Sequence, residues 1–567
     1  MIDSYFEKLH SLRASDAFLL RIALIAFVAF LVAYLVQFSL QATVKIPTFG
    51  GTLSEGIIGT PRFVNPVLAV TRADKDLTAL IYDGLMQLGH EGILVPNVAE
   101  SVTISDDGLT YNVVLKHDVR FHDGAPLTAR DVVFTVQRIQ DPLLTSPLRA
   151  NFSGITVEEI GEYELNFILP EAYTPFIENL TFGILPEHTW KDASVDEFPF
   201  SQYNSQPIGS GPYKIYAINR NTSGIPESYV LTANTDYHFS APKIETLKLS
   251  FFSTREKLAE AFKMGVIESV AGIDAQNLPS FGLDESTHHI ERIPLPRTFA
   301  LFMNQNKSPA LRDLSARNAL SIAIDRDELV KTVLGGYGNA LNTPVPLGFS
   351  SLTPTSSPFE SGVDSARAIL RQGGWKINEE TAHWEKKIDD VVTPLQFTIS
   401  TANSDTFGAT AEFLQNAWVS MGADVTVKQF EQQDLTQAVI RPRNYETLLF
   451  GTQLGRSLDY YSFWHSSQRN DPGLNVALYA NITTDSILSE MRRNTEYAQQ
   501  EEALQKFVKE LSKETPAIFL YAPELLYIVP NKVVGATFTG VSEPQERFST
   551  VYDWYIQTES IWPFFNK

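Results

Sequence analysis

The sequence has 567 residues, 44% of them hydrophobic and 20% charged, which is too long for one hydrophobic core and typical of a folded globular protein. Its formal net charge of -21 disfavours nucleic acids and anionic lipid surfaces as partners of the soluble part. The absence of cysteine excludes disulfides, thiolate metal sites, a cysteine nucleophile and a lipid-modified N-terminal cysteine.

The first predicted element is an apolar segment over residues 17–40, in which Arg21 is the only charged residue. At about 1.5 Å per residue, a helix of this length spans the hydrocarbon core of a bilayer. No convincing small-x-small cleavage site follows, so an uncleaved transmembrane signal anchor is favoured over a cleaved signal sequence. A buried soluble helix fits less well, because the segment has no polar face. Basic residues are more numerous before the segment than just after it, which places residues 1–16 in the cytoplasm and the remainder outside a cell membrane crossed once.

Short strands and helices alternate along the rest of the chain without a strict βαβ repeat, which predicts a mixed α/β protein. Runs of β-branched and aromatic residues bounded by Gly, Pro, Asn or Asp indicate the strands, and Thr128 is a candidate N-cap. The predicted strands are 110–115, 163–169, 214–217, 246–251, 299–303, 395–400, 425–429 and 447–450. The predicted helices are 74–82, 128–139, 254–264, 311–324, 326–333, 364–371, 406–421 and 496–511.

Several longer motifs follow one another through the predicted soluble part. They read LTALIYDGL at 77–85, LVPNVAE at 94–100, DGLTYNVVLKHDVRFHDGAPLTARDVV at 107–133, PIGSGPY at 207–213 and RNALSIAIDRDELV at 317–330. Asp123-Gly124 is a turn signal after a strand, and the glycines of PIGSGPY suit a sharp bend. In this order the motifs resemble the extracellular solute-binding proteins called family 5, the oligopeptide-, dipeptide- and nickel-binding components of ABC importers.

The resemblance implies a two-lobed, periplasmic-binding-protein-like fold of the Venus flytrap type, with an extra inserted subdomain. Lobe I comprises residues 46–90, 207–295 and 525–567, the inserted subdomain residues 91–206, and lobe II residues 296–524. Prolines lie at both predicted crossings between the lobes, and stiff crossings suit a hinge. The resemblance also implies that a peptide or other small solute is captured between the lobes and passed to ABC permease subunits.

Residues 450–467, FGTQLGRSLDYYSFWHSS, depart from the pattern of the family. In relatives that bind peptides with a free amino terminus, an aspartate of this loop pairs with the ammonium of the ligand. The matching position here is Gly455 or Arg456, depending on a one-residue gap. A cation at that place favours a carboxylate or another anion of the ligand, and the alternative for Arg456 is an ordinary salt bridge. Asp459 either takes over the pairing with an ammonium or caps a turn.

The candidate ligand-binding residues come from this loop, from the stretch before the first soluble helix and from the second crossing. Ligand sites are largely apolar, so aromatic residues of the loop are included, although we expect half of them to lie in the core. The complete set is Arg62, Phe63, Asn65, Gln453, Gly455, Arg456, Asp459, Tyr460, Trp464 and Tyr521.

No phosphate-binding, zinc-protease or serine-hydrolase motif is present in the sequence, so we expect a monomeric binding protein that is not an enzyme and has no metal or cofactor. His117 and His122 lie near acidic residues, but inside a strand–turn motif, which argues against a metal site. Two alternatives remain open. One is a non-peptide solute bound by the same fold. The other is a membrane-anchored surface protein that binds peptides or glycans for sensing or chaperoning, without a transporter.

Overall fold

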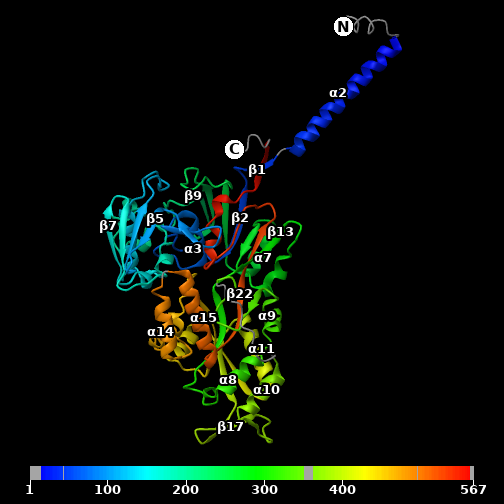
Figure 1. Ribbon diagram of the computed structural model, residues 1–567. Coiled ribbons are helices and arrows are strands. Elements are labelled where there is room, and N and C mark those ends of the chain that lie inside the picture. Colours follow the sequence, from blue (N-terminus) through cyan, green and yellow to red (C-terminus); the bar gives the residue numbers. More distant parts are fainter. Residues whose placement is uncertain (1–13, 43, 350–361, 495, 562–567) are drawn as a thin grey trace.

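The computed structural model describes residues 14–42, 44–349, 362–494 and 496–561. Most of the predicted cytoplasmic flank 1–16 lies outside these ranges. Helix α2 (Ala14–Ala42) covers the predicted apolar segment and stands away from the body of the molecule (Figure 1). Between Phe18 and Leu35 the helix is unburied, and by length and composition it is suited to cross a membrane.

A small antiparallel sheet joins the two ends of the body. Strand β1 (Val44–Thr48) pairs with β23 (Gln557–Ile561), so that the chain enters and leaves the body side by side (Figure 1). The sequence does not predict this pairing, because the two short runs are separated by nearly the whole chain and neither one alternates clearly.

One long strand, β22 (Ala517–Pro530), runs through both lobes (Figure 1). Its first half pairs with β14 (Arg297–Met303) and its second half with β13 (His288–Pro294). The other strands on the β13 side are β2 (Thr52–Ile58), β9 (Tyr213–Arg220), β10 (Pro226–Ala233), β11 (Thr246–Phe252) and β12 (Ser269–Ala271). Those on the β14 side are β15 (Gly338–Ala340), β19 (Gln396–Ala402), β20 (Asp424–Phe430) and β21 (Thr447–Gln453). The fold is therefore two-lobed and mixed α/β, and the exact bounds of the lobes stay a prediction.

Strand β22 is absent from the predicted strands. Its sequence, AIFLYAPELLYIVP, is apolar almost throughout and contains Pro523, so it lacks the alternation of a half-buried strand. In the structure both faces of β22 are covered, and Pro523 lies opposite Gly338 where β22 changes partner from β14 to β13. A proline cannot donate to a ladder, and this change of partner is where one is tolerated.

The inserted subdomain is an antiparallel sheet with one long helix. Its strands lie in the order β5 (Ala99–Ile104), β6 (Thr110–Leu115), β8 (Glu164–Ile168) and β7 (Thr156–Gly161). Helix α4 (Ala129–Gln140) begins after Thr128, which is the predicted cap, and Thr128 donates from its N–H and hydroxyl to Asp131 at 2.9 and 3.0 Å. Buried residues of the subdomain and of lobe I form one hydrophobic cluster, so the two share a core.

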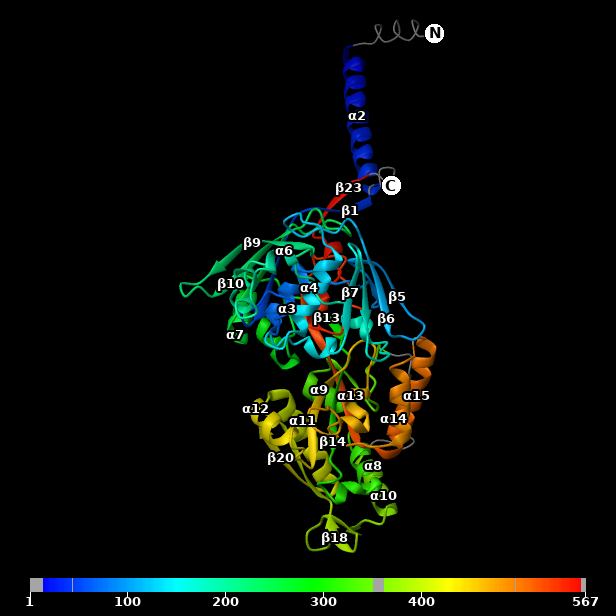
Figure 2. The same cartoon turned by 90° about the vertical axis from the view of Figure 1, so that its left-hand side faces the viewer.

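Lobe II has a hydrophobic core on each face of its sheet. Alternate residues of β14 enter the two cores: Leu301 and Met303 pack on one face, and Ala300 and Phe302 on the other. Figure 1 shows the two sets of helices on opposite sides of this lobe, and Figure 2 shows the same lobe turned by 90°. One set is α8 (Leu314–Ile322), α9 (Arg326–Leu334), α10 (Val363–Gln372) and α11 (Asp405–Met421), and the other is α13 (Tyr461–Trp464), α14 (Ile482–Met491) and α15 (Tyr497–Glu514).

The predicted strands and helices coincide with observed ones, apart from shifts at their ends. The remaining predicted helices are α3 (Arg72–Ile81) and α7 (Arg255–Lys263). One shift is in α8, which the sequence places from residue 311. The helix begins at Leu314 because the Asp313 side chain accepts the N–H of Ala316 and caps it there, after a separate turn over Ala310–Arg312.

Candidate ligand-binding site

The loop 453–461 of lobe II lies at the boundary between the lobes. Strand β21 ends at Gln453, the loop follows, and α13 begins at Tyr461. On one side the loop contacts the inserted subdomain, and on the other it contacts a C-terminal segment of lobe I, residues 540–546. This loop holds five of the predicted ligand-binding residues: Gln453, Gly455, Arg456, Asp459 and Tyr460.

Glu178 of the inserted subdomain reaches the loop from helix α5 (Phe176–Asn179). Its carboxylate accepts the backbone N–H of Arg456 at 2.9 Å and that of Ser457. Burial raises the pKa of the Glu178 carboxyl, and the bonds from Ser457 and the charge of Arg456 offset part of that rise. A methyl group at Gly455 would stand 2.5 Å from Glu178 Oε2, so a Cβ there would force the Glu178 carboxylate to shift. Glu178 was not among the predicted residues, because it lies in a different lobe and a different motif.

The Arg456 side chain points to lobe I on the opposite side of the loop. Its Nε donates to Gly540 O at 3.2 Å, and its Nη2 donates to Ser542 Oγ at 3.3 Å and to Glu546 Oε2 at 2.9 Å. The side chain is 14% exposed, so the pair with Glu546 is largely shielded from water. The structure thus shows the salt bridge that the sequence left as one alternative for Arg456, and the bridge joins the two lobes.

Gln453 makes a second link to the same segment of lobe I. Its Nε2 donates to Glu543 Oε1 at 2.7 Å and to Ser542 O at 3.3 Å, while its Oε1 accepts from Arg297 Nη2 at 2.9 Å. Burial lowers the pKa of the Arg297 guanidinium, and nearby Glu543 opposes this shift. Arg297 stands at the first residue of β14, and the sequence offered no signal for it. Lys75 at the start of α3 also pairs with Glu543, at 3.5 Å.

Asp459 is held at the far end of the loop. It accepts from Arg492 Nη2 at 2.6 Å, from the Tyr173 hydroxyl at 3.3 Å and from the backbone N–H of Tyr461 at 3.1 Å. The last contact is the turn cap that the sequence left as one alternative. The Arg492 guanidinium lies 3.9 Å from the centre of the Tyr461 ring and 5.2 Å from that of Tyr173. Asp459 is thus paired within the protein, across the boundary between lobe II and the inserted subdomain.

Two predicted aromatic residues of the loop lie in the core of lobe II. Tyr460 and Trp464 are each 2% exposed. The Tyr460 hydroxyl donates to Pro344 O at 3.1 Å, and Trp464 packs beside Phe302 and Phe519. Both belong to one of the hydrophobic cores of lobe II, which agrees with the expectation that half of the loop aromatics are core residues.

Tyr521 and Asn65 are also fully buried. Tyr521 stacks on Phe299 and shares a hydrogen bond of 2.8 Å with the hydroxyl of Thr410. Asn65 donates to Asn204 Oδ1 at 3.0 Å and accepts the N–H of Val67. Both side chains hold neighbouring backbone and side chains in place.

Arg62 and Phe63 lie on the turn before helix α3. Their backbone N–H groups donate to Asp74 Oδ1 at 2.6 and 2.9 Å, and the same carboxylate takes part in the capping box with Thr71. The Arg62 side chain is exposed and lies 4.9 Å from the centre of the Phe63 ring. Among the described residues, the hydrogen bonds of these two residues go to Asp74 and not to loop 453–461, so the structure brings together only part of the predicted set.

A cavity of about 20 Å³ lies beside the ion pair of Asp459. Its lining includes Pro175, Ser457, Tyr461, Arg492 and Gln500. A space of this size holds about one water molecule, so it is not a peptide site.

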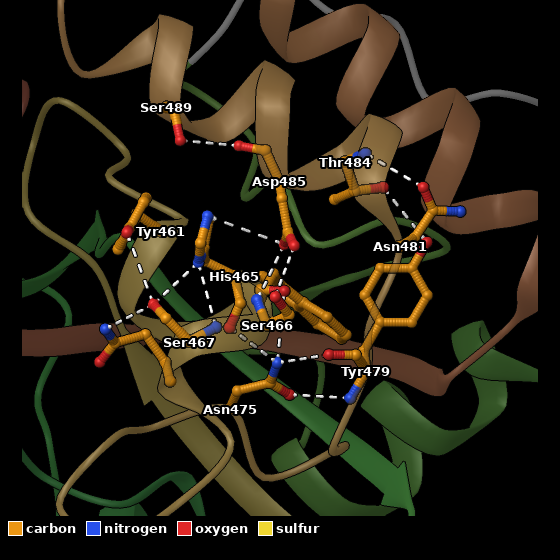
Figure 3. Close-up of polar contacts among 12 residues, drawn as sticks. Tyr461, His465, Ser466, Ser467, Asn475, Tyr479, Asn481, Thr484, Asp485 and Ser489 are labelled. Carbon is orange, nitrogen blue, oxygen red and sulfur yellow. Dashed lines mark hydrogen bonds and ion pairs between the residues drawn. The ribbon is translucent and has the colours of Figure 1, made fainter.

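A dense polar network supports the end of the loop (Figure 3). The His465 ring stacks on Tyr461 with centres 4.1 Å apart, and its Nδ1 lies 2.8 Å from Ser467 Oγ. Asp485 accepts from the Ser466 N–H at 2.8 Å and from its hydroxyl at 2.5 Å. His465 Nε2 is 3.9 Å from Asp485 Oδ1, beyond a hydrogen bond, so Asp485 does not orient the His465 ring through one. The network fixes α13 against α14.

The histidines near acidic residues make hydrogen bonds or ion pairs with neighbouring protein groups. His122 Nε2 lies 3.0 Å from the carbonyl of Gly211, and His188 pairs with Asp123 at 2.8 Å. Among the residues that the structure describes, no group of three or more His, Asp or Glu side chains is placed to hold a metal ion.

The chain matches the family described as bacterial extracellular solute-binding proteins, family 5 Middle, over residues 94–473. It is 26% identical over 531 residues to the oligopeptide-binding protein AppA of Bacillus subtilis (strain 168), which covers 90% of this chain and 92% of that protein. The structure of that AppA in complex with a nonapeptide aligns with a TM-score of 0.67 and 25% identity, over 90% of this chain and all of that one. The ABC transporter substrate-binding protein CtaP of Listeria monocytogenes aligns with a TM-score of 0.74 and 25% identity, over 90% and 100% of the two chains.

Proposed function

Because this chain belongs to the bacterial extracellular solute-binding proteins of family 5, we propose that it captures peptides between its two lobes outside the cytoplasm and delivers them to the permease of an ABC importer. The observation that carries this proposal is the likeness, over 90% of the chain, to a protein whose structure holds a nonapeptide. A peptide is held mainly through its backbone in such proteins, so the loss of one charged anchor in the loop is compatible with peptide binding.

The position of loop 453–461 supports the proposal. The loop is bonded both to the inserted subdomain through Glu178 and to lobe I through Glu546, so any solute next to it meets groups from both sides of the boundary. Closure of a two-lobed protein on a solute gains free energy when the solute contacts both lobes better in the closed state.

We further propose that α2 remains on the chain and anchors it in the cell membrane, with the body on the extracytoplasmic side. The helix has 29 residues, and its apolar stretch is unburied. Alkaline carbonate extraction of membranes is the test, together with the intact mass of the extracted chain. An intact chain of 63.3 kDa in the membrane pellet is expected; a shorter chain in the soluble fraction would contradict the anchor.

The ligand is tested with the full chain purified in detergent. Mass spectrometry of the material released on denaturation is expected to give peptides, and calorimetry with a peptide mixture is expected to give saturable binding. Release of a glycan or a metal complex, with no binding of peptides, would contradict the proposal. Peptide binding without any cross-link to permease subunits in membranes would favour the sensing or chaperoning alternative over transport.

Arg456→Ala tests how the arginine acts. If Arg456 serves only to bridge the lobes, the variant loses affinity by about tenfold both for a peptide with a free C-terminal carboxylate and for the same peptide with an amidated C-terminus. If Arg456 binds the carboxylate of the ligand, the loss is much larger for the peptide with the free carboxylate. We expect the equal loss, because the guanidinium already bonds Glu546, Ser542 and Gly540. Arg493→Ala, an exposed arginine beside Arg492, is the control.

A further inference from the structure

The segment 173–178 of the inserted subdomain contacts lobe II at several consecutive points. The Tyr173 hydroxyl donates to Asp459, the N–H of Thr174 donates to the carbonyl of Arg492 at 2.9 Å, and Glu178 accepts from the loop. Phe176, between them, is fully buried in the core shared with lobe I. The segment therefore packs in the core shared by the inserted subdomain and lobe I, while its polar groups form hydrogen bonds with lobe II.

Within this segment, Glu178 makes a bidentate contact with the backbone of loop 453–461. One carboxylate oxygen accepts the N–H of Arg456 and the other accepts the N–H of Ser457. Two successive amides on one carboxylate set the orientation of the loop, and hydrogen bonds to an ionised acceptor are stronger than neutral ones. The approach depends on Gly455, whose missing Cβ leaves the space that Oε2 occupies.

The same loop is bonded to lobe I from the other side. Arg456 reaches Glu546 and Gly540, and Gln453 reaches Glu543. A rigid-body opening that separates loop 453–457 from lobe I and its inserted subdomain has to break the contacts on both sides. These contacts are made by protein groups alone, so whatever solute is present they favour the arrangement in which the loop bonds both sides, which we take as the closed one.

We infer that Glu178 is a positioning residue of the binding protein: it fastens loop 455–457 across the boundary between the lobes and shifts the equilibrium toward the closed arrangement. Gly455 is the partner that makes this possible. The inference concerns closure, which is measurable without a ligand, and it deepens the proposed function by naming the residue pair that sets how readily the lobes open.

The test is a distance measurement between the lobes. Because the chain has no cysteine, Thr222→Cys in lobe I and Thr426→Cys in lobe II, both exposed, label it at two chosen places for pulsed electron paramagnetic resonance. In the full chain in detergent, Glu178→Ala is expected to lower the ratio of closed to open molecules by about tenfold or more. Glu178→Gln, which keeps the shape but loses the charge and one acceptor, is expected to give a smaller shift.

Gly455→Ala supplies the decisive comparison. On its own it is expected to open the lobes as Glu178→Ala does, since its Cβ would displace the carboxylate. In the Glu178→Ala background it is expected to have no further effect, because the group it clashes with is gone. Glu171→Ala, an exposed glutamate just before the segment, is the control.

Two results would overturn the inference. One is an unchanged distance distribution in Glu178→Ala, with a thermal unfolding midpoint like that of the parent. The other is an equal effect of Gly455→Ala with and without Glu178. Neither result bears on whether the ligand is a peptide, so this inference and the proposed function fail separately.

Discussion

Arg492 and Asp459 form a bidentate ion pair at the end of loop 453–461. Arg492 Nη2 lies 2.6 Å from Asp459 Oδ2, and Nε lies 3.0 Å from Oδ1. The guanidinium is enclosed between the rings of Tyr461 and Tyr173, so it is only partly hydrated. The pair fixes the distance between the loop and the end of α14, and through Tyr173 it reaches the inserted subdomain.

Asp459→Asn and Arg492→Met are each expected to lower the free energy of unfolding of lobe II by about 1–3 kcal/mol, because each leaves a partly buried partner unpaired. The double variant should lose less than the sum of the two, with a coupling of at least about 0.5 kcal/mol. Denaturant titration measures all three. Arg493→Met is the control, since that neighbour is exposed. Strictly additive losses would show that the pair contributes nothing of its own.

A buried charge network in lobe I is expected to be the most sensitive polar site of the body. Arg547 donates to Asp76 at 2.7 Å through both Nη atoms and to Glu55 at 2.5 Å, and the Tyr527 hydroxyl completes the network at Glu55. All four side chains are at most 2% exposed. Arg547→Ala removes the cation that bonds both carboxylates and leaves Asp76 the longer 3.6 Å pair with Arg72, so it should cost about 3–5 kcal/mol in the free energy of unfolding.

The control for Arg547 is a surface pair. Arg255 and Asp274 lie 2.8 Å apart but are 55% and 47% exposed, so Arg255→Ala should change the free energy of unfolding by less than about 1 kcal/mol. Equal losses in the two variants would mean that burial does not set the strength of the network.

The pH dependence of stability is expected to have a contribution from His122. Burial lowers the pKa of its imidazole from 6.5 to about 4, against a smaller opposing effect of the bond to the Gly211 carbonyl. Between these two values the unfolded chain binds more protons than the folded chain. The contribution of His122 is therefore fully present above about pH 6.5 and is lost as the pH falls toward 4, by up to about 3 kcal/mol.

His122→Gln removes this group, so its stability should fall less than that of the parent between pH 7 and pH 4.5. Unfolding in urea at the two pH values gives the difference, and other titrating groups cancel in the comparison. His90→Gln, at an exposed position, is the control. An unchanged pH slope in His122→Gln would contradict the assignment.

Gly209 of the PIGSGPY motif is expected to tolerate no side chain. A Cβ at this position would lie 2.0 Å from the carbonyl oxygen of Ile81 at the end of α3, and backbone atoms cannot move aside easily. Gly209→Ala should therefore lower the free energy of unfolding by at least about 1–3 kcal/mol. Gly161→Ala is the matched control, since nothing lies within 4 Å of the added methyl group. Similar melting temperatures of the two variants would show that the bend relaxes.

Much of the architecture was predictable from local pattern. The strand over Thr110–Leu115 is rich in β-branched and aromatic residues, Thr128 with Asp131 marks the start of α4, and the apolar run of α2 is unmistakable by length. The motifs along the chain indicated the family, which the match over residues 94–473 confirms. These features depend on neighbours in the sequence, so the sequence alone carries them.

The candidate site was less accessible to such reasoning. The sequence indicated that loop 450–467 departs from its family and that Gly455 and Arg456 mark the departure. It did not indicate Glu178 or Arg297, because nothing local distinguishes a glutamate that crosses to another lobe from one that faces water. It also left open which of the loop aromatics are buried.

The sequence by itself thus determined the class of fold, the apolar helix, the family and the missing carboxylate of the loop. Only the tertiary structure decided what fills the space left by Gly455 and where the charge of Arg456 goes. The partners, Glu178 and Glu546, lie far from the loop along the chain and on opposite sides of it in space. The physical reason is that local pattern reflects hydrogen bonding and burial within an element, whereas a contact between lobes depends on how whole elements are placed.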